Sequence, residues 1–176
     1  MLGFFETVRI RHSIRKYQPD MAVESEKLHA ILEMACAAPS AGDLQAYRIY
    51  VISKQSTRNA LAKAADKQEF ISEAPICLVF CTDEIKAEEK YGNRGKQLYT
   101  VQDATIAAAY AQLAIVAAGL GSTWIGFFDE KNVGEILSLD SGIKPVAMLS
   151  LGYPAEIPEA SSRQPLDKVV IFDDES

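Results

Sequence analysis

The chain has 176 residues, of which 48% are hydrophobic and 24% are charged, and its formal net charge is −6 at pH 7. This length and composition indicate one globular domain, residues 1–176, with enough chain to bury a sizeable core. The acidic balance argues against a nucleic-acid binder and against a protein that binds membrane surfaces. No signal peptide is recognisable, because Glu6 and Arg9 precede any apolar run, and the longest apolar stretch, residues 104–120, is broken by polar residues.

Cysteine and histidine usage limits the chemistry further. An odd count of cysteines (Cys36, Cys77 and Cys81) without a leader sequence indicates the reducing cytoplasm. His12 and His29 are the only histidines. Because the sequence offers so few ligands, no metal site is predicted.

Hydrophobic spacing and turn residues predict the elements of the first half of the chain. In order, these are a helix at 3–11, a helix at 24–37 that Pro39 ends, a strand at 47–53, a helix from a cap at Ser56 to about Ala65, and a strand at 75–82. The last of these strands is nearly all apolar, which favours a central position in a sheet.

The second half contains the longest predicted helix. In order, its elements are a polar helix at 83–91, a loop at 91–95, a helix at 97–118 that Gly119 or Gly121 ends, a strand at 122–127, a helix at 129–137 capped by Asp129, a strand at 145–152, a proline-flanked arm and a short strand at 168–172. The helix at 97–118 is apolar on several faces, so we expect both the sheet and a second subunit to cover it. Since helices and strands do not alternate regularly, the predicted fold class is α+β, with helices around one sheet.

A cluster of positive charge lies near the N-terminus. Residues 9–16 contain four of the eighteen Lys and Arg residues and no acid. Arg11 and Arg15 each offer a planar fork of N–H donors that suits phosphate, and His12 and Ser13 can add short hydrogen bonds. The cluster therefore predicts an anion site, with a solvated basic face beside a helix as the alternative.

Three further segments have features of a binding site. The turn at 38–45 places backbone N–H groups and polar side chains between a helix and a strand, although an ordinary connection has the same composition. In the strand at 123–127, Gly126 would let a flat ligand approach the backbone, and a simple bend is the alternative. Arg163 lies on the proline-flanked arm, where a solvated loop charge is the simple interpretation.

Familiar catalytic motifs are absent from the sequence. No G-x-G-x-x-G follows a strand, no phosphate-loop or G-x-S-x-G pattern occurs, and two histidines leave few ways to build a catalytic triad. The chemistry is therefore expected to come from a bound cofactor, or the protein performs none.

Taken together, these segments resemble the FMN-dependent nitroreductase family. Residues 11–17 match its opening pattern R-[RH]-S-x-R-x-[YF], and residues 38–40 with Gln45 match A-P-S-x-x-x-x-Q. Two later strings, W-I-G and P-V-A-x-x-x-L-G-Y-P, are also similar. The resemblance thus covers nearly the whole chain, from Thr7 to about Val170.

The resemblance implies an α+β fold with a central, mostly antiparallel sheet, in an intertwined homodimer with two FMN sites at its interface. It implies that Arg11 and Ser13 hold the FMN phosphate and ribityl chain with His12 alongside. Arg15 would reach the pyrimidine edge of the flavin, and the backbone of Gly126 would lie near its reactive edge. The remaining implied cofactor ligands are Pro39, Ser40 and Asp43 from the partner subunit, the motif residue Gln45, Gln68, and Arg163 as a second positive charge at the phosphate.

The implied activity is a ping-pong oxidoreduction. NAD(P)H would pass a hydride to flavin N5, and a nitroaromatic or a quinone would then take it up, with Arg15 stabilising negative charge on the reduced ring and no catalytic side chain. Residues 86–99 would shape the substrate face. Three alternatives stay open: a flavin store or sensor without reductase activity, a phosphate-binding module without flavin, and another flavin chemistry such as reductive dehalogenation or flavin cleavage.

Two positions depart from the family's pattern. Asp43 stands where the family often has Asn, and an ionised carboxylate accepts hydrogen bonds but cannot donate them. A negative charge at that position would also disfavour the reduced, anionic flavin. Ala46 and Tyr47 stand where the family often has Pro-Trp. These departures bear on substrate and redox potential rather than on flavin binding.

Overall fold

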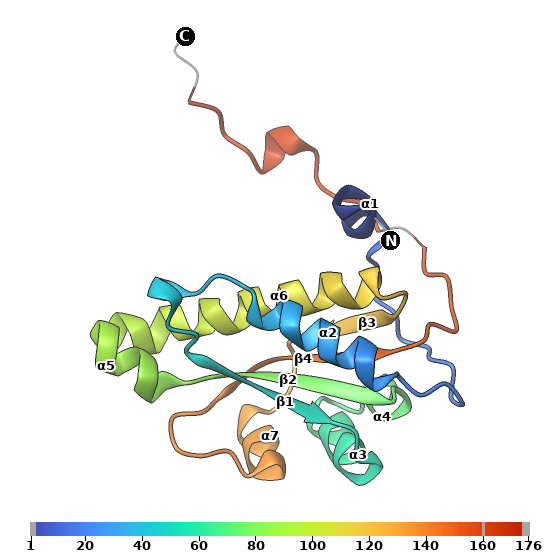
Figure 1. Ribbon diagram of the computed structural model, residues 1–176, viewed down its shortest axis with the longest axis horizontal. Coiled ribbons are helices and arrows are strands. Elements are labelled where there is room, and N and C mark those ends of the chain that lie inside the picture. The colour runs from blue at the N-terminus through green and yellow to red at the C-terminus, as the bar shows by residue number, and fades with distance from the viewer. Residues whose placement is uncertain (1–2, 160, 174–176) are drawn as a thin grey trace.

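The computed structural model describes residues 3–159 and 161–173, within which four strands form one sheet (Figure 1). The strand order is β1-β2-β4-β3, and every neighbouring pair is antiparallel. The strands are β1 (Tyr47–Ile52), β2 (Ile76–Thr82), β3 (Gly121–Ile125) and β4 (Pro145–Gly152). The α+β fold with an antiparallel sheet is therefore confirmed, and β2 lies inside the sheet as predicted.

Helices account for much of the remaining chain in these ranges. They are α1 (Phe4–Ile10), α2 (Ser25–Cys36), α3 (Gln55–Ala64), α4 (Phe70–Glu73), α5 (Glu84–Arg94), α6 (Thr100–Ala117) and α7 (Glu130–Leu137), with 3-10 turns η1 (Ala41–Asp43) and η3 (Leu166–Lys168) and a π-helical turn η2 (Gly95–Tyr99). None of the helices in the described part of the chain is long and apolar enough to cross a membrane.

The helices form two layers, one on each face of the sheet (Figure 1). α2 and α6 cover one face, whereas α3, α4 and α7 cover the other. In β2, Leu78 and Phe80 pack into the core under α2 and α6, while Cys77 and Val79 pack into the opposite core. Because side chains alternate across a strand, a strand covered on both faces is apolar throughout, which explains its sequence.

The predicted loop at 91–95 is wrong, because α5 runs on to Arg94 and continues through η2 into α6. Gly92 leaves helical geometry, with φ of 59°, and kinks the path without ending it. Gly95 allows a close approach, since a Cβ there would lie 2.3 Å from the backbone oxygen of Ala87. The two glycines that look like loop signals therefore serve a kink and a tight helical contact.

Smaller differences concern the ends of elements. α3 begins before Ser56, which is therefore not its cap. The short strand predicted at 168–172 is wrong, because residues 161–173 form only the turn η3 on an arm that projects from the body (Figure 1). Two other predictions are confirmed: Gly119, with φ of 77°, follows the end of α6, and the side chain of Asp129 caps α7.

Candidate functional site

The residues Arg11–Arg15, called here the basic segment, follow α1 and lie along the outer edge of β3. Ser13 forms an isolated parallel bridge with Ser122, and the backbone N–H of Ile14 donates to the Ser122 carbonyl oxygen at 3.0 Å. β3 is the last strand of the sheet, so this edge is free to accept a further backbone segment. The sheet therefore fixes the backbone from which the two arginines project.

Buried hydroxyl groups bind the backbone of the same segment on its core side. The Tyr17 hydroxyl donates to the carbonyl oxygen of Ile14 at 2.7 Å and lies 2.8 Å from the Ser150 Oγ. The hydroxyl of Thr123 donates to the same Ile14 oxygen. Burial raises the pKa of Tyr17 well above its ordinary value, so the phenol remains a neutral donor. These bonds restrain the peptide group that joins Ile14 to Arg15.

A carboxylate from the chain's last third also contacts the basic segment. Glu156 Oε1 accepts from the backbone N–H groups of Arg15, at 2.6 Å, and of Lys16, at 3.1 Å. Neither Arg11 nor Arg15 forms an ion pair with any residue that the structure describes. The two guanidinium groups are therefore available to an external anion, which is a notable feature in a protein with a net charge of −6.

Arg15, Gln68 and Gly126 each have a neighbour in the segments 68–70 and 124–127. The Arg15 guanidinium lies over the Phe70 ring, 5.9 Å from its centroid, and Gln68 Nε2 donates to the Phe127 carbonyl oxygen at 3.1 Å. Gly126 is exposed, and a Cβ added there would meet only the Trp124 ring, at 3.5 Å or more. The chain itself therefore does not require glycine at this position, which favours a ligand as the reason for it.

A second group of predicted residues lies in the turn Ser40–Gln45, between α2 and β1. Ser40 Oγ accepts from the Gln45 backbone N–H at 2.9 Å, and Gln45 Nε2 donates to the Cys36 carbonyl oxygen at 2.9 Å. Gly42, Asp43 and Gln45 all have positive φ, between 51° and 53°. Left-handed geometry at non-glycine residues is uncommon and concentrates at functional sites. Asp43 is exposed, as is Pro39, which precedes the turn.

The basic segment and the Ser40–Gln45 turn lie toward opposite ends of α6. The basic segment pairs with Ser122, just beyond the carboxyl end of the helix, whereas the Ala41 N–H donates to Asp103 in its first turn. The rise from Asp103 to Ala117 is about 20 Å at 1.5 Å per residue. One chain therefore holds two groups of predicted site residues without bringing them together.

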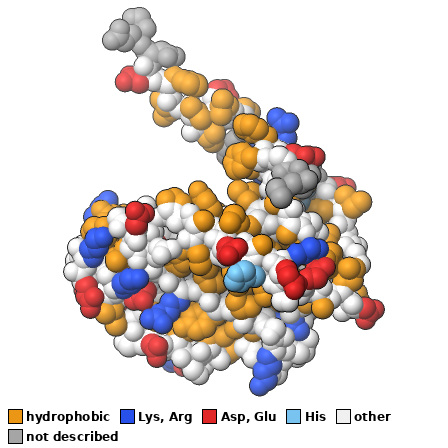
Figure 2. Space-filling view, in the orientation of Figure 1, with side chains coloured by type: hydrophobic (Ala, Val, Ile, Leu, Met, Phe, Trp, Pro, Cys, Tyr) orange, Lys and Arg blue, Asp and Glu red, His pale blue; other side chains and the backbone are white. Residues whose placement is uncertain are grey.

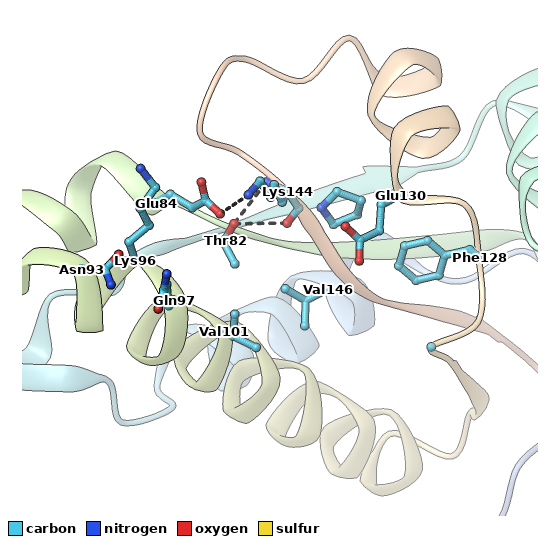
Figure 3. Close-up of a pocket in the computed structure, with 12 residues that line it drawn as sticks. Thr82, Glu84, Asn93, Lys96, Gln97, Val101, Phe128, Glu130, Lys144 and Val146 are labelled. Atoms are coloured by element: carbon cyan, nitrogen blue, oxygen red, sulfur yellow. Dashed lines mark hydrogen bonds and ion pairs between the residues drawn. The ribbon is translucent and has the colours of Figure 1, made fainter.

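A cavity of about 510 Å³ opens beside Gly126 (Figure 3). It is lined by Thr82, Glu84, Asn93, Lys96, Gln97, Val101, Gly126, Phe128, Glu130, Lys144, Pro145 and Val146. Figure 3 shows Asn93, Lys96 and Gln97 on one side and Phe128 and Glu130 on the other.

The cavity is lined by polar side chains on its walls and by apolar side chains on its floor. Lys144 Nζ pairs with Glu84 Oε1 at 2.6 Å, while Val101 and Val146 lie between the polar walls (Figure 3). The segment 86–99, predicted to shape the substrate face, therefore does border a cavity that reaches Gly126.

The remaining predicted residues are more dispersed. Arg11 and His12 are half-buried, and His12 lines a second cavity of about 500 Å³ with Arg9 and Glu156. Arg163 lies on the projecting arm, and within the described residues it bonds to its neighbours at 161–162 and not to the basic segment.

Sequence reasoning missed several residues that organise these groups. Asp103 is 3% exposed, Glu156 binds the backbone of the basic segment, and Phe70 supports Arg15. The signal for Asp103 was a single acid inside an Ala-rich helix, which is expensive to bury without a partner. No local pattern marked Glu156, because its partners lie about 140 positions earlier in the chain.

Comparisons with known proteins agree with the fold and the motifs. The model of the Nitroreductase family matches residues 8–69 and 64–153. An NADH dehydrogenase from Thermus thermophilus is 34% identical over 92% of this chain and 92% of its own length. The NADPH:FMN oxidoreductase from Vibrio harveyi, solved with NAD+, superposes with a TM-score of 0.89 and 28% identity, covering 98% of this chain and 78% of that one. The FMN reductase (NADPH) of Bacillus subtilis is 25% identical over 96% of this chain and 73% of its own length. This chain therefore belongs to the nitroreductase family.

Proposed function

We propose that this protein is an FMN-dependent oxidoreductase that takes hydride from NAD(P)H and reduces a nitroaromatic or quinone-type acceptor in a ping-pong cycle. The observation that carries the proposal is the basic segment, where the guanidinium groups of Arg11 and Arg15 project from a backbone that β3 and Tyr17 fix. Within the described residues neither guanidinium forms an ion pair. Relatives named as an NADH dehydrogenase and an FMN reductase, and a similar structure that contains NAD+, support the same reaction class.

The donors present fit FMN. Arg11 and Ser13 would bind the phosphate and ribityl chain, because a guanidinium fork matches phosphate geometry and a hydroxyl adds a further bond. When bound, FMN supplies the two-electron hydride chemistry that the side chains lack. Arg15, held by Phe70 and by the bond from its backbone to Glu156, would place a fixed positive charge beside the pyrimidine edge and stabilise negative charge there.

The separation of the two groups of site residues supports a homodimer with shared sites. A second copy would bring its own Ser40–Gln45 turn to the basic segment of the first, with Pro39, Ser40 and Asp43 facing the flavin. Around α1 and α6 the surface is apolar: Phe4, Met34 and Tyr110 line a groove of about 450 Å³ and are all exposed. Figure 2 shows hydrophobic side chains along the projecting arm and on the part of the body beneath it, with charged side chains over α2. Such a surface fits a large subunit interface.

Asp43 would distinguish this protein from relatives with Asn there. Its carboxylate, when ionised, can accept from the flavin N3–H but cannot donate to the adjacent carbonyl group. Its negative charge would oppose the charge of Arg15 and lower the reduction potential of the cofactor.

The cavity beside Gly126 would receive the nicotinamide and the acceptor in turn. Its amide side chains, Asn93 and Gln97, can bond to a carboxamide, a nitro group or a quinone oxygen, and Val101 and Val146 offer apolar contacts. A single cavity beside the reactive edge requires one product to leave before the second substrate enters, which is the basis of the ping-pong order.

The test is the visible spectrum of the purified protein after incubation with FMN and gel filtration. Retention of a flavin band, its bleaching by NADH or NADPH without oxygen, and its return on addition of a quinone or nitroaromatic are expected. A colourless protein would contradict flavin binding and favour a phosphate-binding module. A yellow protein that neither cofactor bleaches would contradict the reductase activity and favour a flavin store or sensor.

A further inference from the structure

We propose that Asp103 and Lys90 are positioning residues that hold the Ser40–Gln45 turn in its left-handed form, from which it contacts the flavin of the partner protomer. The flavin part of this inference rests on the proposed function, whereas the clamp itself can be tested without flavin. Neither residue is among the predicted cofactor ligands, and neither is offered as one here, although Lys90 lies in the segment 86–99 that was predicted to shape the substrate face.

The turn requires an external restraint. Gly42, Asp43 and Gln45 have φ of 52°, 53° and 51°, and two of the three are not glycine. Left-handed backbone is unfavourable for residues that carry a Cβ, so such a geometry persists only where the surroundings enforce it. The bond from the Gln45 N–H to Ser40 Oγ lies within the turn, and the bond from Gln45 Nε2 to the Cys36 carbonyl oxygen ties only the last residue of the turn to α2.

Asp103 supplies the restraint from α6. Its side chain is buried, with the residue 3% exposed, and Oδ1 accepts from the Ala41 backbone N–H at 2.9 Å. The two residues are 62 positions apart, so this bond ties the turn to the helix across the molecule. A buried carboxyl group is unfavourable without a hydrogen-bond donor, which makes the Ala41 N–H a specific partner.

α5 supplies the restraint from the other side. Lys90 Nζ donates to the Gly42 carbonyl oxygen at 3.0 Å. The Tyr91 hydroxyl packs so closely on Gly42 that an added Cβ would lie 2.1 Å from it. Because α5 and α6 are joined directly through η2, the two restraints come from one continuous helical path. The turn is therefore tied by hydrogen bonds to both α5 and α6, in addition to its own bonds.

Hydrogen exchange of the flavin-free protein tests the clamp directly. In Asp103→Ala, we expect exchange of the Ala41 amide to accelerate at least tenfold, because its acceptor is lost. The Ile14 amide, bonded to β3 at the far end of α6, is the internal control and is expected to stay within twofold. Asp103→Asn keeps an acceptor oxygen and is expected to retain protection. Unchanged exchange at Ala41 in Asp103→Ala would overturn the proposal.

Flavin titration tests the consequence of the clamp. Asp103→Ala and Lys90→Met are each expected to raise the Kd for FMN at least fivefold and to shift the midpoint potential of the bound flavin, whereas Asp103→Asn stays near wild type. Lys63→Met, an exposed lysine on α3, is the matched control. A merely structural role would lower the melting temperature without moving the Kd or the potential, and that result would overturn the positioning role.

The two tests distinguish a failure of the proposed function from a failure of the clamp. If the wild-type protein fails to bind FMN, the proposed function is wrong, while hydrogen exchange at Ala41 still decides whether the clamp exists. If Asp103→Ala fails to fold, Lys90→Met carries the test, and an unchanged FMN Kd in that variant would overturn the proposal.

Discussion

The two halves of the candidate site are built in different ways. The basic segment pairs its backbone with β3, and buried hydroxyls of Tyr17 and Thr123 fix the carbonyl group of Ile14. The Ser40–Gln45 turn has left-handed geometry and is held by side chains of α5 and α6. The first half is thus an extension of the sheet, whereas the second depends on a few long-range contacts. This difference predicts where each half is sensitive to mutation.

The strongest test of the comparison is complementation between two inactive variants. Arg15→Ala damages the basic segment, and Asp43→Arg damages the turn. If each site takes one half from each protomer, a mixed dimer contains one doubly damaged site and one intact site. Random exchange of subunits between the two variants should therefore restore about a quarter of wild-type activity from nearly none. The measurement is NAD(P)H oxidation after unfolding and refolding an equimolar mixture.

The control for this experiment is each variant refolded alone. If activity fails to return in the mixture although dimers form, both halves of each site come from the same protomer. That outcome would remove the main reason for a shared site, and the separation along α6 would need another explanation.

A second test separates the roles of the two arginines within the basic segment. Arg11→Ala should raise the FMN Kd by about 10- to 100-fold, because a charge-assisted bond to phosphate is lost. Arg15→Ala should bind FMN more tightly than Arg11→Ala does, but NAD(P)H should reduce its bound FMN more slowly, since this variant lacks the charge beside the ring. Equilibrium titration and anaerobic stopped-flow absorbance measure the two effects. Equal effects of both variants on both quantities would contradict the assigned roles.

The same comparison shows what the sequence could predict. β2 was placed in the middle of the sheet because an apolar run without alternation needs cover on both faces. The basic segment could be predicted because its charged residues are close together in the sequence. The loop at 91–95 was predicted wrongly because Gly92 and Gly95 are breakers in isolation, and only the packing of Gly95 on Ala87 shows that the helix continues.

The contacts that organise the site were not predictable from the sequence. The bond between Ala41 and Asp103 joins residues 62 positions apart, and the bond from Arg15 to Glu156 joins residues 141 positions apart. No local pattern encodes such pairs. The strand predicted at 168–172 failed for a related reason, because a strand needs a neighbour and the arm projects from the body of its own chain.

Two glycines offer a third test, because one serves the fold and the other is proposed to serve the ligand. Gly42→Ala should lower the free energy of unfolding by about 1–2 kcal/mol, since φ is 52° and the new Cβ would meet the Tyr91 hydroxyl. Gly126→Ala should change it by less than about 0.5 kcal/mol, because its nearest neighbour is 3.5 Å away. Gly126→Ala should nevertheless weaken FMN binding. Urea unfolding and FMN titration measure the pair, and a Gly126→Ala variant with unchanged FMN affinity would contradict a close approach of the flavin.

The smallest expected effect is a pH dependence of the free energy of unfolding that arises from Tyr17, beneath the basic segment. At pH 8, Tyr17→Phe should lower the free energy of unfolding by about 1–2 kcal/mol, because the Ile14 carbonyl loses its buried phenol donor and the Ser150 hydroxyl loses its partner. Burial raises the pKa of Tyr17 above its ordinary value of 10.0, so above about pH 10 the unfolded chain releases a proton that the folded chain keeps. Wild-type stability therefore falls there as pH rises, and Tyr17→Phe lacks this loss.

The difference in the free energy of unfolding between wild type and Tyr17→Phe should accordingly narrow by about 0.8 kcal/mol between pH 8 and pH 10.5. Tyr110→Phe, at a side chain that is 42% exposed on α6, is the matched control. Urea unfolding at both pH values measures the gap. A gap that stays constant or widens would mean that the Tyr17 hydroxyl is not a neutral, buried donor. The basic segment would then rest on its pairing with β3 alone, and the two halves of the site would differ less than their hydrogen bonds indicate.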